Sequence, residues 1–333
     1  MPTSRKPSGQ NHPAPAAKRP VEPSPSSVLD RLDRWLVGHR AWTLAAILVA
    51  SVLLRAGYYL QLSQGPCLWQ HRWDQSDMNF FDSWARQIAA GDVLSKDVKM
   101  PLHGWHKEVA QIYYAKHPNE RSEPTVKVNV DGKVVEEVSD QDARKLWEQW
   151  CGNGRFYQDP LYSYLLAGVY KLFGPDVRWM FLFHMLAGVA GNVLIYLLAR
   201  RFFGETTAVL AAALAVACGP ILYYELVLVR ETFISLAGLI LVYMTVRAMD
   251  RKRWTGWLAL GAATGAAVLL KSHFWAYLAG VGLAILLTHR KNLRALAVGL
   301  GALAAGFFLA MTPLIARNLS VGAPAMTSTT AGG

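Results

Sequence analysis

Long apolar segments separated by short clusters of basic residues fill the sequence from Val177 onward. Each segment has about 20 residues, the length that an α-helix needs to cross the hydrocarbon core of a bilayer. The composition agrees, because 53% of the residues are hydrophobic and only 17% are charged. That composition excludes a disordered or collagen-like chain, and 3 cysteines exclude a disulfide scaffold. The sequence predicts an all-α polytopic membrane protein.

About seven transmembrane helices are expected, and one orientation accounts for the charges between them. With the N-terminus inside, the basic clusters Arg200–Arg201, Asp250–Arg253 and His289–Arg294 all lie on the cytoplasmic side, as the positive-inside rule requires. The remaining chain then divides into an external loop (63–176), a helix bundle (177–316) and an external C-terminal segment (317–333). The predicted spans are Trp42–Leu62, Val177–Ala199, Thr206–Tyr223, Leu226–Ala248, Trp254–Leu270, Phe274–Leu287 and Leu293–Leu314.

The apolar stretch Pro160–Gly174 is treated separately, because its length of about 15 residues is below that of a usual span. If it crossed the bilayer, every later basic cluster would move to the outside, against the positive-inside rule. We therefore predict a helix that lies at, or dips into, the outer membrane face.

Residues 1–41 precede the first span and add to the excess of positive charge, which is 34 − 23 = +11 for the whole chain. Residues up to Ser27 are rich in Pro, Ser, Ala and Lys, so we expect a disordered basic cytoplasmic tail. Val28–Arg40 has helical spacing of its apolar residues and fits either an interfacial helix or an extension of the first span. Because the basic residues follow the membrane pattern, no nucleic-acid partner is expected.

The external loop is the one sizeable polar part of the sequence. Within it, Asp77–Ala90 predicts an amphipathic helix that ends at Gly91. Thr125–Val138 alternates apolar and polar residues around Asp131-Gly132, which predicts a β-hairpin. A further short helix is expected at Arg144–Trp150.

Two cysteines, Cys67 and Cys151, lie in the external loop. In an oxidising compartment they either bridge the two ends of the loop or remain as two free thiols. Cys218 falls inside a predicted span, where we expect it to act as a small packing residue.

Ionisable residues at the outer membrane face are the first candidates for chemistry, because charges in or near a bilayer are costly and usually functional. A carboxylate among several cations suits an anionic headgroup such as a phosphate, together with a proton acceptor. Interfacial snorkelling and local ion pairing are the structural alternative. The residues predicted on this basis are Glu225, Arg230, Glu231, Lys271, His273 and Arg317.

Three aspartates, Asp74, Asp77 and Asp82, follow the first span. Asp77 and Asp82 are five positions apart, so on a helix they diverge and do not form an obvious carboxylate pair. Each of the three is also explained as a carboxylate that is stabilised at a helix N-terminus.

Four stretches of the sequence resemble the C-type glycosyltransferases, in particular the aminoarabinose transferase and protein O-mannosyltransferase group (glycosyltransferase family 39). In the first, an acidic residue is followed by an aromatic residue four positions on and by a helix that ends in Gly-Asp. The order, spacing and common external placement of the stretches carry the resemblance, which runs from Trp42 to the C-terminus. The stretches are Gln75–Asp92, Phe156–Tyr164 continuing to Leu172–Gly174, Leu226–Phe233 and Pro313–Asn318.

The resemblance implies an enzyme that moves a sugar from a polyprenyl-phosphate carrier to a hydroxyl-bearing lipid, glycan or protein. Asp77 would be the catalytic base, and Glu231 matches the second acidic residue of the family, with Glu in place of the more usual Asp. Lys271 and Arg317 would contact the carrier phosphate, whose charge needs cations. No His, Cys or Asp cluster has metal-ligand spacing and this group acts without a metal, so neither a metal nor a cofactor is expected.

Two departures from the family pattern affect these expectations. Some relatives carry Lys just before the Pro of the juxtamembrane helix, where this chain has Asp159, so phosphate binding is expected to be arranged differently. Family members also commonly continue through several more spans, whereas this sequence ends at Gly333, which suggests a fragment or a reduced relative.

Two rival functions fit a polytopic membrane protein. A transporter or flippase would show inverted repeats and charges near the midplane, whereas here no repeat is found and the charges cluster at one face. A non-catalytic assembly subunit would bind a partner through its external loop and would tolerate neutral replacement of Asp77 and Glu231. For the enzyme we expect a bacterial inner membrane, with a cytoplasmic N-terminus and a periplasmic loop.

Overall fold

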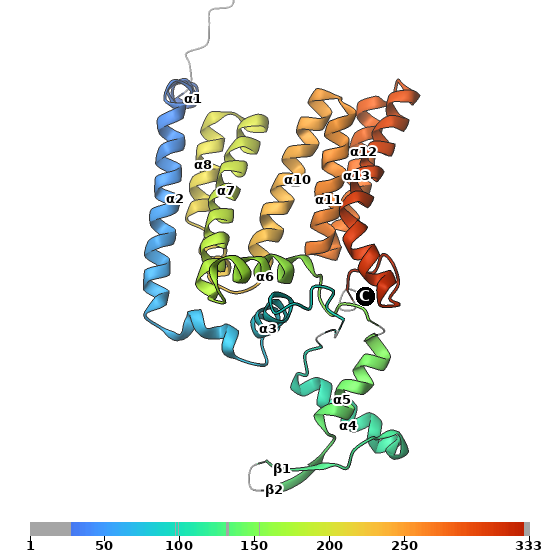
Figure 1. Ribbon diagram of the computed structural model, residues 1–333. Helices are drawn as coiled ribbons and strands as arrows, with labels where there is room; N and C mark the ends of the chain where they lie inside the picture. The colour runs from blue at the N-terminus through green and yellow to red at the C-terminus, as the bar shows by residue number, and fades with distance from the viewer. Residues whose placement is uncertain (1–27, 97, 99, 131–132, 153, 330–333) are drawn as a thin grey trace, which may run out of the picture.

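The computed structural model describes residues 28–96, 98, 100–130, 133–152 and 154–329. Most of its helices run side by side as a bundle, and one helix lies across the end of the bundle that is lowest in Figure 1. We call this the loop end, because residues 64–176 leave the bundle there. The opposite end, where the first helix and the connection 252–253 lie, is called the tail end.

Helices occur at all seven predicted spans, but not all have spanning length. Within the described residues, four are long and apolar enough to cross a membrane, and a fifth crossing is counted if the bent pair α8 and α9 is one span. The shorter α11 and α12 have 17 and 15 residues, so the count of seven spans stays a prediction. The bundle helices are α2 (Arg40–Ser63), α7 (Val177–Phe203), α8 (Glu205–Val216), α9 (Gly219–Glu225), α10 (Glu231–Arg251), α11 (Trp254–Leu270), α12 (Trp275–His289) and α13 (Leu293–Ser320), with a 3-10 turn η4 (Ser272–Phe274) between α11 and α12.

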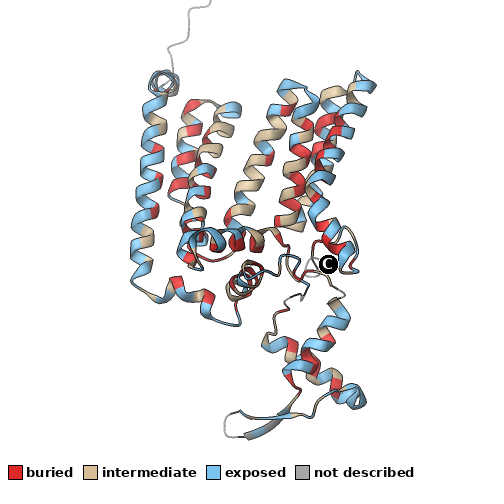
Figure 2. Cartoon of the chain, viewed as in Figure 1, coloured by how far each residue is buried: buried red, intermediate tan, exposed pale blue. Residues whose placement is uncertain are grey.

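The outer surface of the bundle is apolar, as a lipid environment requires. On α2, Val49, Val52 and Leu53 expose 56%, 52% and 65% of their surface. Figure 2 shows α2 exposed along most of its length. A surface of this kind is unfavourable in water, so the exposed side chains support the assignment as an integral membrane protein.

The segment Thr206–Tyr223, which is predicted as one span, is divided in the structure. The helix stops at Val216, and α9 starts at Gly219 with a bend of 53° between the two. Pro220 explains the new start, because proline fits the first turn of a helix but lacks the N–H that a helix interior needs.

The span that is predicted to begin at Leu226 begins at Glu231 instead. The residues between α9 and α10 form a turn, although they are strongly apolar. They are apolar because they lie in the protein core, where Leu226, Val227 and Leu228 each expose 5% or less. Burial within the protein, and not contact with lipid, accounts for this part of the pattern.

The first helix, α1 (Val28–Gly38), is separate from α2 and is seen end-on in Figure 1, across the direction of α2. Asp33 fastens α1 to the bundle, because its carboxylate accepts hydrogen bonds from the backbone N–H and the hydroxyl of Thr206, at 2.9 and 3.1 Å. Val28–Gly38 is therefore not a straight extension of the first span, and its place in the membrane interface stays a prediction. The predicted disordered tail, residues 1–27, lies outside the described residues.

At the loop end, α6 (Leu161–Phe173) lies across the bundle and α3 (Asp77–Ala89) packs on it (Figure 1). The ring of Phe81 meets the ring of Tyr162 edge to face, with centroids 4.9 Å apart. The Tyr170 hydroxyl donates a hydrogen bond to the Asp82 carboxylate. Burial and this hydrogen bond both raise the pKa of Tyr170, so the hydroxyl keeps its proton and remains the donor. The predicted helix at the membrane face is therefore present as α6, and it fixes the position of α3.

A small module extends from the loop end and has a core of its own. The predicted hairpin is present as an antiparallel pair in which Val128 lies opposite Val135, while its turn lies outside the described residues. The module core consists of Ala110, Tyr114, Val138, Ala143 and Leu146. The elements of the external loop besides α3 and α6 are η1 (Pro66–Arg72), α4 (Gly104–Lys116), η2 (Pro118–Glu120), β1 (Val126–Val130), β2 (Lys133–Glu137), α5 (Asp140–Trp147) and the π-helical turn η3 (Glu148–Gly152).

In the external loop, the start of α5 differs from the prediction, and the state of the cysteines decides between the two alternatives given for them. The helix predicted at Arg144–Trp150 begins earlier, because the Ser139 hydroxyl caps it by accepting the backbone N–H of Asp142 at 3.1 Å. Cys67 and Cys151 are free thiols in the structure, as is Cys218. Of the two alternatives for the cysteines, the structure thus has the unpaired one.

The predicted orientation can be tested by labelling introduced cysteines in a chain whose own three cysteines are replaced by serine. We expect Glu108→Cys, in α4, to react with a membrane-impermeant maleimide in intact cells, and Arg251→Cys to react only after lysis. Both positions are exposed, so a difference in labelling reports the side of the membrane and not burial. Labelling of Arg251→Cys in intact cells would overturn the orientation.

Candidate functional site

A buried carboxylate, Asp159, joins three segments at the loop end. It exposes 1% of its surface and stands just before α6. One carboxylate oxygen, Oδ2, lies 3.4 Å from Nη1 of Arg230 and accepts the backbone N–H of Ser272 at 3.1 Å. The other, Oδ1, accepts the hydroxyl of Ser328 at 2.8 Å. Because these partners precede α10, follow α11 and follow α13, one side chain sets the relative positions of three turns.

Arg230, which is predicted to bind substrate, belongs to this cluster. It exposes 5% of its surface and donates a hydrogen bond of 2.7 Å to Oε1 of Gln158. Its guanidinium carbon lies 5.7 Å from the centre of the Phe81 ring in α3, within the range of a cation–π contact. Arg230 therefore links α3 to the start of α10.

Arg317, another predicted phosphate contact, is engaged with the protein backbone. Its N–H groups donate to the carbonyl oxygens of Leu94 at 2.9 Å, of Ser95 at 2.6 Å and of Gly154. The guanidinium carbon also lies 3.9 Å from the centre of the Phe156 ring. In the structure this arginine ties the external loop to the end of α13, and each of its nitrogens already has an acceptor.

Glu225 is fully buried and forms an ion pair with Arg55 of α2. The distance from Nη2 of Arg55 to Oε1 of Glu225 is 2.7 Å, and the two side chains expose 2% and 0% of their surface. Arg55 also donates to the Ser51 hydroxyl at 2.5 Å, and the ring of His184 contacts the Glu225 carbonyl oxygen at 3.1 Å. The Glu225 carboxylate is thus engaged inside the bundle.

Asp77 differs from these three residues, because its carboxylate accepts no hydrogen bond within the described part of the chain. It is the exposed first residue of α3, and the capping role belongs to Ser76, whose hydroxyl accepts the backbone N–H of Asn79 at 3.1 Å. Burial raises the pKa of Tyr157, and the nearby charge of Asp77 raises it further. The ring of Phe80, one turn further along α3, lies 5.6 Å from the ring of Tyr157, so the start of α3 packs against the segment that leads to Asp159.

Glu231, Lys271 and His273 also have no side-chain partner among the described residues. Glu231 is exposed at the first position of α10, directly after Arg230. Lys271 is half-buried and precedes Ser272, which donates to Asp159, while His273 is exposed. The seven predicted site residues therefore divide into three that hold the fold together and four whose charged or polar groups are free.

Two cavities lie near these residues, and Asp77 and Lys271 line neither of them. One of about 140 Å³ lies between α7, α9 and α10, with Glu231 and Thr232 in its wall. A larger cavity of about 670 Å³ lies between the end of α2, α3 and the start of α7. Its lining includes Arg72, Arg86 and Arg178, together with His71, whose pKa is lowered by burial.

The three arginines of the larger cavity are not equally available. Arg86 pairs with Asp82 at 2.9 Å and Arg178 with Asp176 at 2.5 Å. Arg72 has no acidic partner in the described chain and lies 4.1 Å from the centre of the Trp69 ring. Arg72 therefore resembles Lys271 in having no carboxylate partner among the described residues.

Sequence reasoning missed two residues that organise this region. The signal for Arg55 is visible, because a single charge in an otherwise apolar span requires a partner. Asp159 is noticed only as a departure from a family pattern, since no sequence spacing shows that Arg230, Ser272 and Ser328 converge on it. No group of three or more His, Cys, Asp and Glu side chains in the described residues is placed to hold a metal ion.

Comparison with known families supports a transferase. Residues 158–316 match the family model described as dolichyl-phosphate-mannose-protein mannosyltransferase, which confirms the resemblance to C-type glycosyltransferases. Over this segment the chain is thus similar to a family of membrane glycosyltransferases. The matched range includes Asp159, Glu231 and Lys271, but not Asp77. No curated protein and no solved structure matches the chain.

The buried ion pair predicts a strong effect of a small substitution in α7. A Cβ atom at Gly188 would lie 1.8 Å from Oε1 of Glu225 and 2.6 Å from Nη2 of Arg55, so Gly188→Ala must displace the pair. We expect a loss of about 1–3 kcal/mol in unfolding free energy, as is typical when an added methyl group overpacks a core and shifts its side chains. Thermal unfolding in detergent measures this loss.

Gly191→Ala, one turn further along α7, is the matched control. There the added Cβ would meet Cδ1 of Leu239 at 3.6 Å, which is ordinary contact, and alanine favours the helix. Equal melting temperatures for the two variants would contradict the importance of the close approach.

Proposed function

We propose that this protein transfers a sugar from a polyprenyl-phosphate carrier to a hydroxyl-bearing acceptor at the loop end of the bundle. The observation that carries the proposal is that Glu231 and Lys271, which have no side-chain partner among the described residues, adjoin two partners of the buried Asp159. Asp77, also without a partner there, begins the helix that packs on Tyr157 through Phe80. The family match over residues 158–316 supports the same class of reaction.

Asp77 is the base in this proposal. A neutral hydroxyl is a weak nucleophile, so a carboxylate must accept its proton as the hydroxyl oxygen attacks the anomeric carbon of the sugar. The bond from that carbon to the phosphate oxygen breaks, and its electron pair leaves with the phosphate. Glu231 is the second acidic group, and its place at the rim of the 140 Å³ cavity suits contact with the sugar or the acceptor.

Lys271 is the proposed contact for the carrier phosphate, because a departing phosphate is stabilised by a nearby cation. Its position beside Ser272 holds it next to the Asp159 cluster. His273, exposed two residues on, is a further donor for the same anion. Arg230, Arg317 and Glu225 then act by positioning the turns and the external loop, since their charged groups are already paired.

The proposed setting is the inner membrane of a bacterium, with the loop end on the periplasmic side and a component of the cell envelope as acceptor. The module around α4 and α5, which extends from the loop end, is the part best placed to meet a lipid, glycan or protein acceptor (Figure 1). A transporter or an assembly subunit would not require the free carboxylate at Asp77, and that difference makes the functions separable by mutation.

We expect Asp77→Asn to slow sugar transfer by about two to four orders of magnitude, because it removes the base and keeps the shape of the side chain. The fold should be retained, since the Asp77 carboxylate accepts no hydrogen bond in the described structure. The assay measures transfer of labelled mannose, the sugar named by the matched family, from a polyprenyl-phosphate donor in membranes.

Asp74→Asn is the matched control for this experiment, because Asp74 is also exposed but precedes the helix. Its rate should stay near that of the unchanged protein. A normal rate from a well-expressed Asp77→Asn variant would remove the base from the mechanism and favour the assembly subunit.

A second experiment asks which free cation meets the carrier phosphate. Lys271→Met should weaken donor binding by about 1.5–3 kcal/mol, the contribution of a hydrogen bond to a charged group, and should raise KM more than it lowers kcat. Arg72→Gln is the comparison, because Arg72 lines the 670 Å³ cavity and Lys271 does not. If Arg72→Gln raises KM and Lys271→Met does not, the phosphate binds beside α3.

A further inference from the structure

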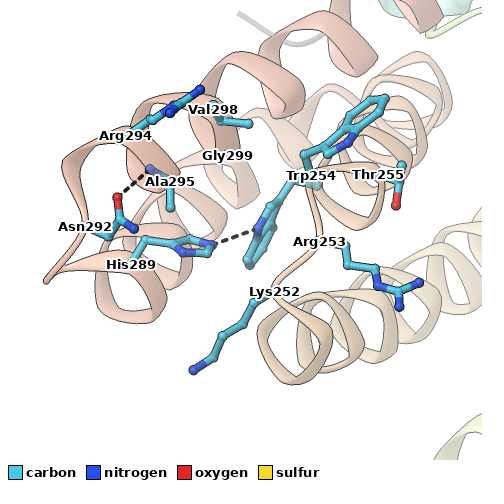
Figure 3. Close-up of a pocket in the computed structure, with 11 residues that line it drawn as sticks. Lys252, Arg253, Trp254, Thr255, His289, Asn292, Arg294, Ala295, Val298 and Gly299 are labelled. Atoms are coloured by element: carbon cyan, nitrogen blue, oxygen red, sulfur yellow. Dashed lines mark hydrogen bonds between the residues drawn. The ribbon is translucent and has the colours of Figure 1, made fainter.

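A second charged cavity lies at the tail end, on the opposite side of the bundle from the proposed transfer site. Two connections far apart in sequence form it, one between α10 and α11 and the other between α12 and α13 (Figure 3). Its volume is about 480 Å³. Its lining includes the charged, histidine and apolar residues Lys252, Arg253, Trp254, His289, Arg294 and Val298.

The cavity is positively charged and contains no acidic side chain. Lys252, Arg253 and Arg294 line it, and none of them pairs with a carboxylate in the described part of the chain. Asp250, the acidic residue nearest in sequence, is already paired with Arg201 at 3.0 Å. Three cations that come from two connections therefore line one cavity, and their charged ends point in different directions around it (Figure 3).

His289, in the lining of the cavity, supplies a neutral hydrogen-bond donor through its Nδ1–H group. The indole N–H of Trp257, which is 1% exposed, donates to Nε2 of His289 at 3.3 Å. A histidine whose Nε2 accepts a hydrogen bond carries its proton on Nδ1 when neutral. That N–H has no partner among the described residues, so it is available to an anion along with the three cations.

The rim of the cavity is apolar where it meets the outer surface of the bundle. Trp254 exposes 55% of its surface and Val298 exposes 49%, and both line the cavity. Leu293, at the first position of α13, exposes 80%. An exposed tryptophan beside cations at the ends of apolar helices is typical of the level of lipid headgroups.

We propose that this cavity binds the phosphate-bearing headgroup of an anionic membrane lipid. The three cations attract the anionic headgroup from different sides of the cavity and His289 donates to a phosphate oxygen, while Trp254, Val298 and Leu293 contact the acyl chains. A basic pocket between membrane helices is suited to this chemistry, because the anionic headgroup brings its own apolar anchor. Free inorganic phosphate has the same charged group without the anchor and is the other source of a ligand.

The test uses the full chain in nanodiscs and detects bound lipid by native mass spectrometry. Phosphatidylglycerol, the anionic probe, is compared with phosphatidylcholine, and inorganic phosphate is added as a competitor. The pocket variant is Lys252→Gln with Arg294→Gln. The control is Arg290→Gln with Lys291→Gln, which removes two exposed charges from the same end but none from the cavity lining.

We expect the pocket variant to bind phosphatidylglycerol about tenfold or more weakly than the control, the loss typical of a charge-assisted contact to phosphate. Ala295→Phe, which fills the cavity and keeps every charge, should weaken binding as well. Equal losses in the pocket variant and the control would show a diffuse surface potential and overturn the site. Displacement of the lipid by inorganic phosphate at similar concentration would identify the free anion as the ligand and overturn the lipid assignment.

Discussion

The hydrogen bonds and ion pair of Asp159 hold the loop end in one arrangement. Moving a carboxylate out of water costs several kcal/mol, and the contacts to Arg230, Ser272 and Ser328 offset that cost. Each partner belongs to a different turn, so a change in one turn leaves a buried charge without compensation. The free groups of Glu231 and Lys271 are neighbours in sequence of two of these partners, and their positions depend on the same carboxylate.

Charged residues in this protein have two distinct tasks, which burial separates. Arg230 and Glu225 are buried in ion pairs, and the buried Arg317 donates to backbone carbonyl oxygens; the three connect helices or fasten the external loop. Asp77, Glu231 and Lys271 are exposed or half-buried and have no partner in the described chain. A charged group without a partner can bind a charged ligand or accept a proton. A charged group that is already hydrogen-bonded within the protein stabilises the fold instead.

The sequence reveals the helices well, because apolar length and basic clusters report on the bilayer directly. It does less well where apolar residues are buried by protein, as at Leu226–Leu228, since burial and lipid contact produce the same pattern. Local signals are also reliable: the alternation around Asp131-Gly132 indicates the hairpin, and Gly91, with φ of +124°, follows the end of α3. What the sequence cannot show is which charges find partners, because Arg55 and Glu225 meet across 170 positions.

The pairing of Arg55 with Glu225 also constrains how the chain is assembled. During synthesis, α2 enters the membrane long before the turn that carries Glu225, and an arginine near the centre of a lone span costs about 2.5–3.5 kcal/mol on insertion scales. The first span carries this cost without its counter-ion until α9 arrives with Glu225. Gly188 leaves the space in which the two charges meet. The ion pair can thus form only after the first 225 residues have been made, which links the setting of the first span to a much later part of the chain.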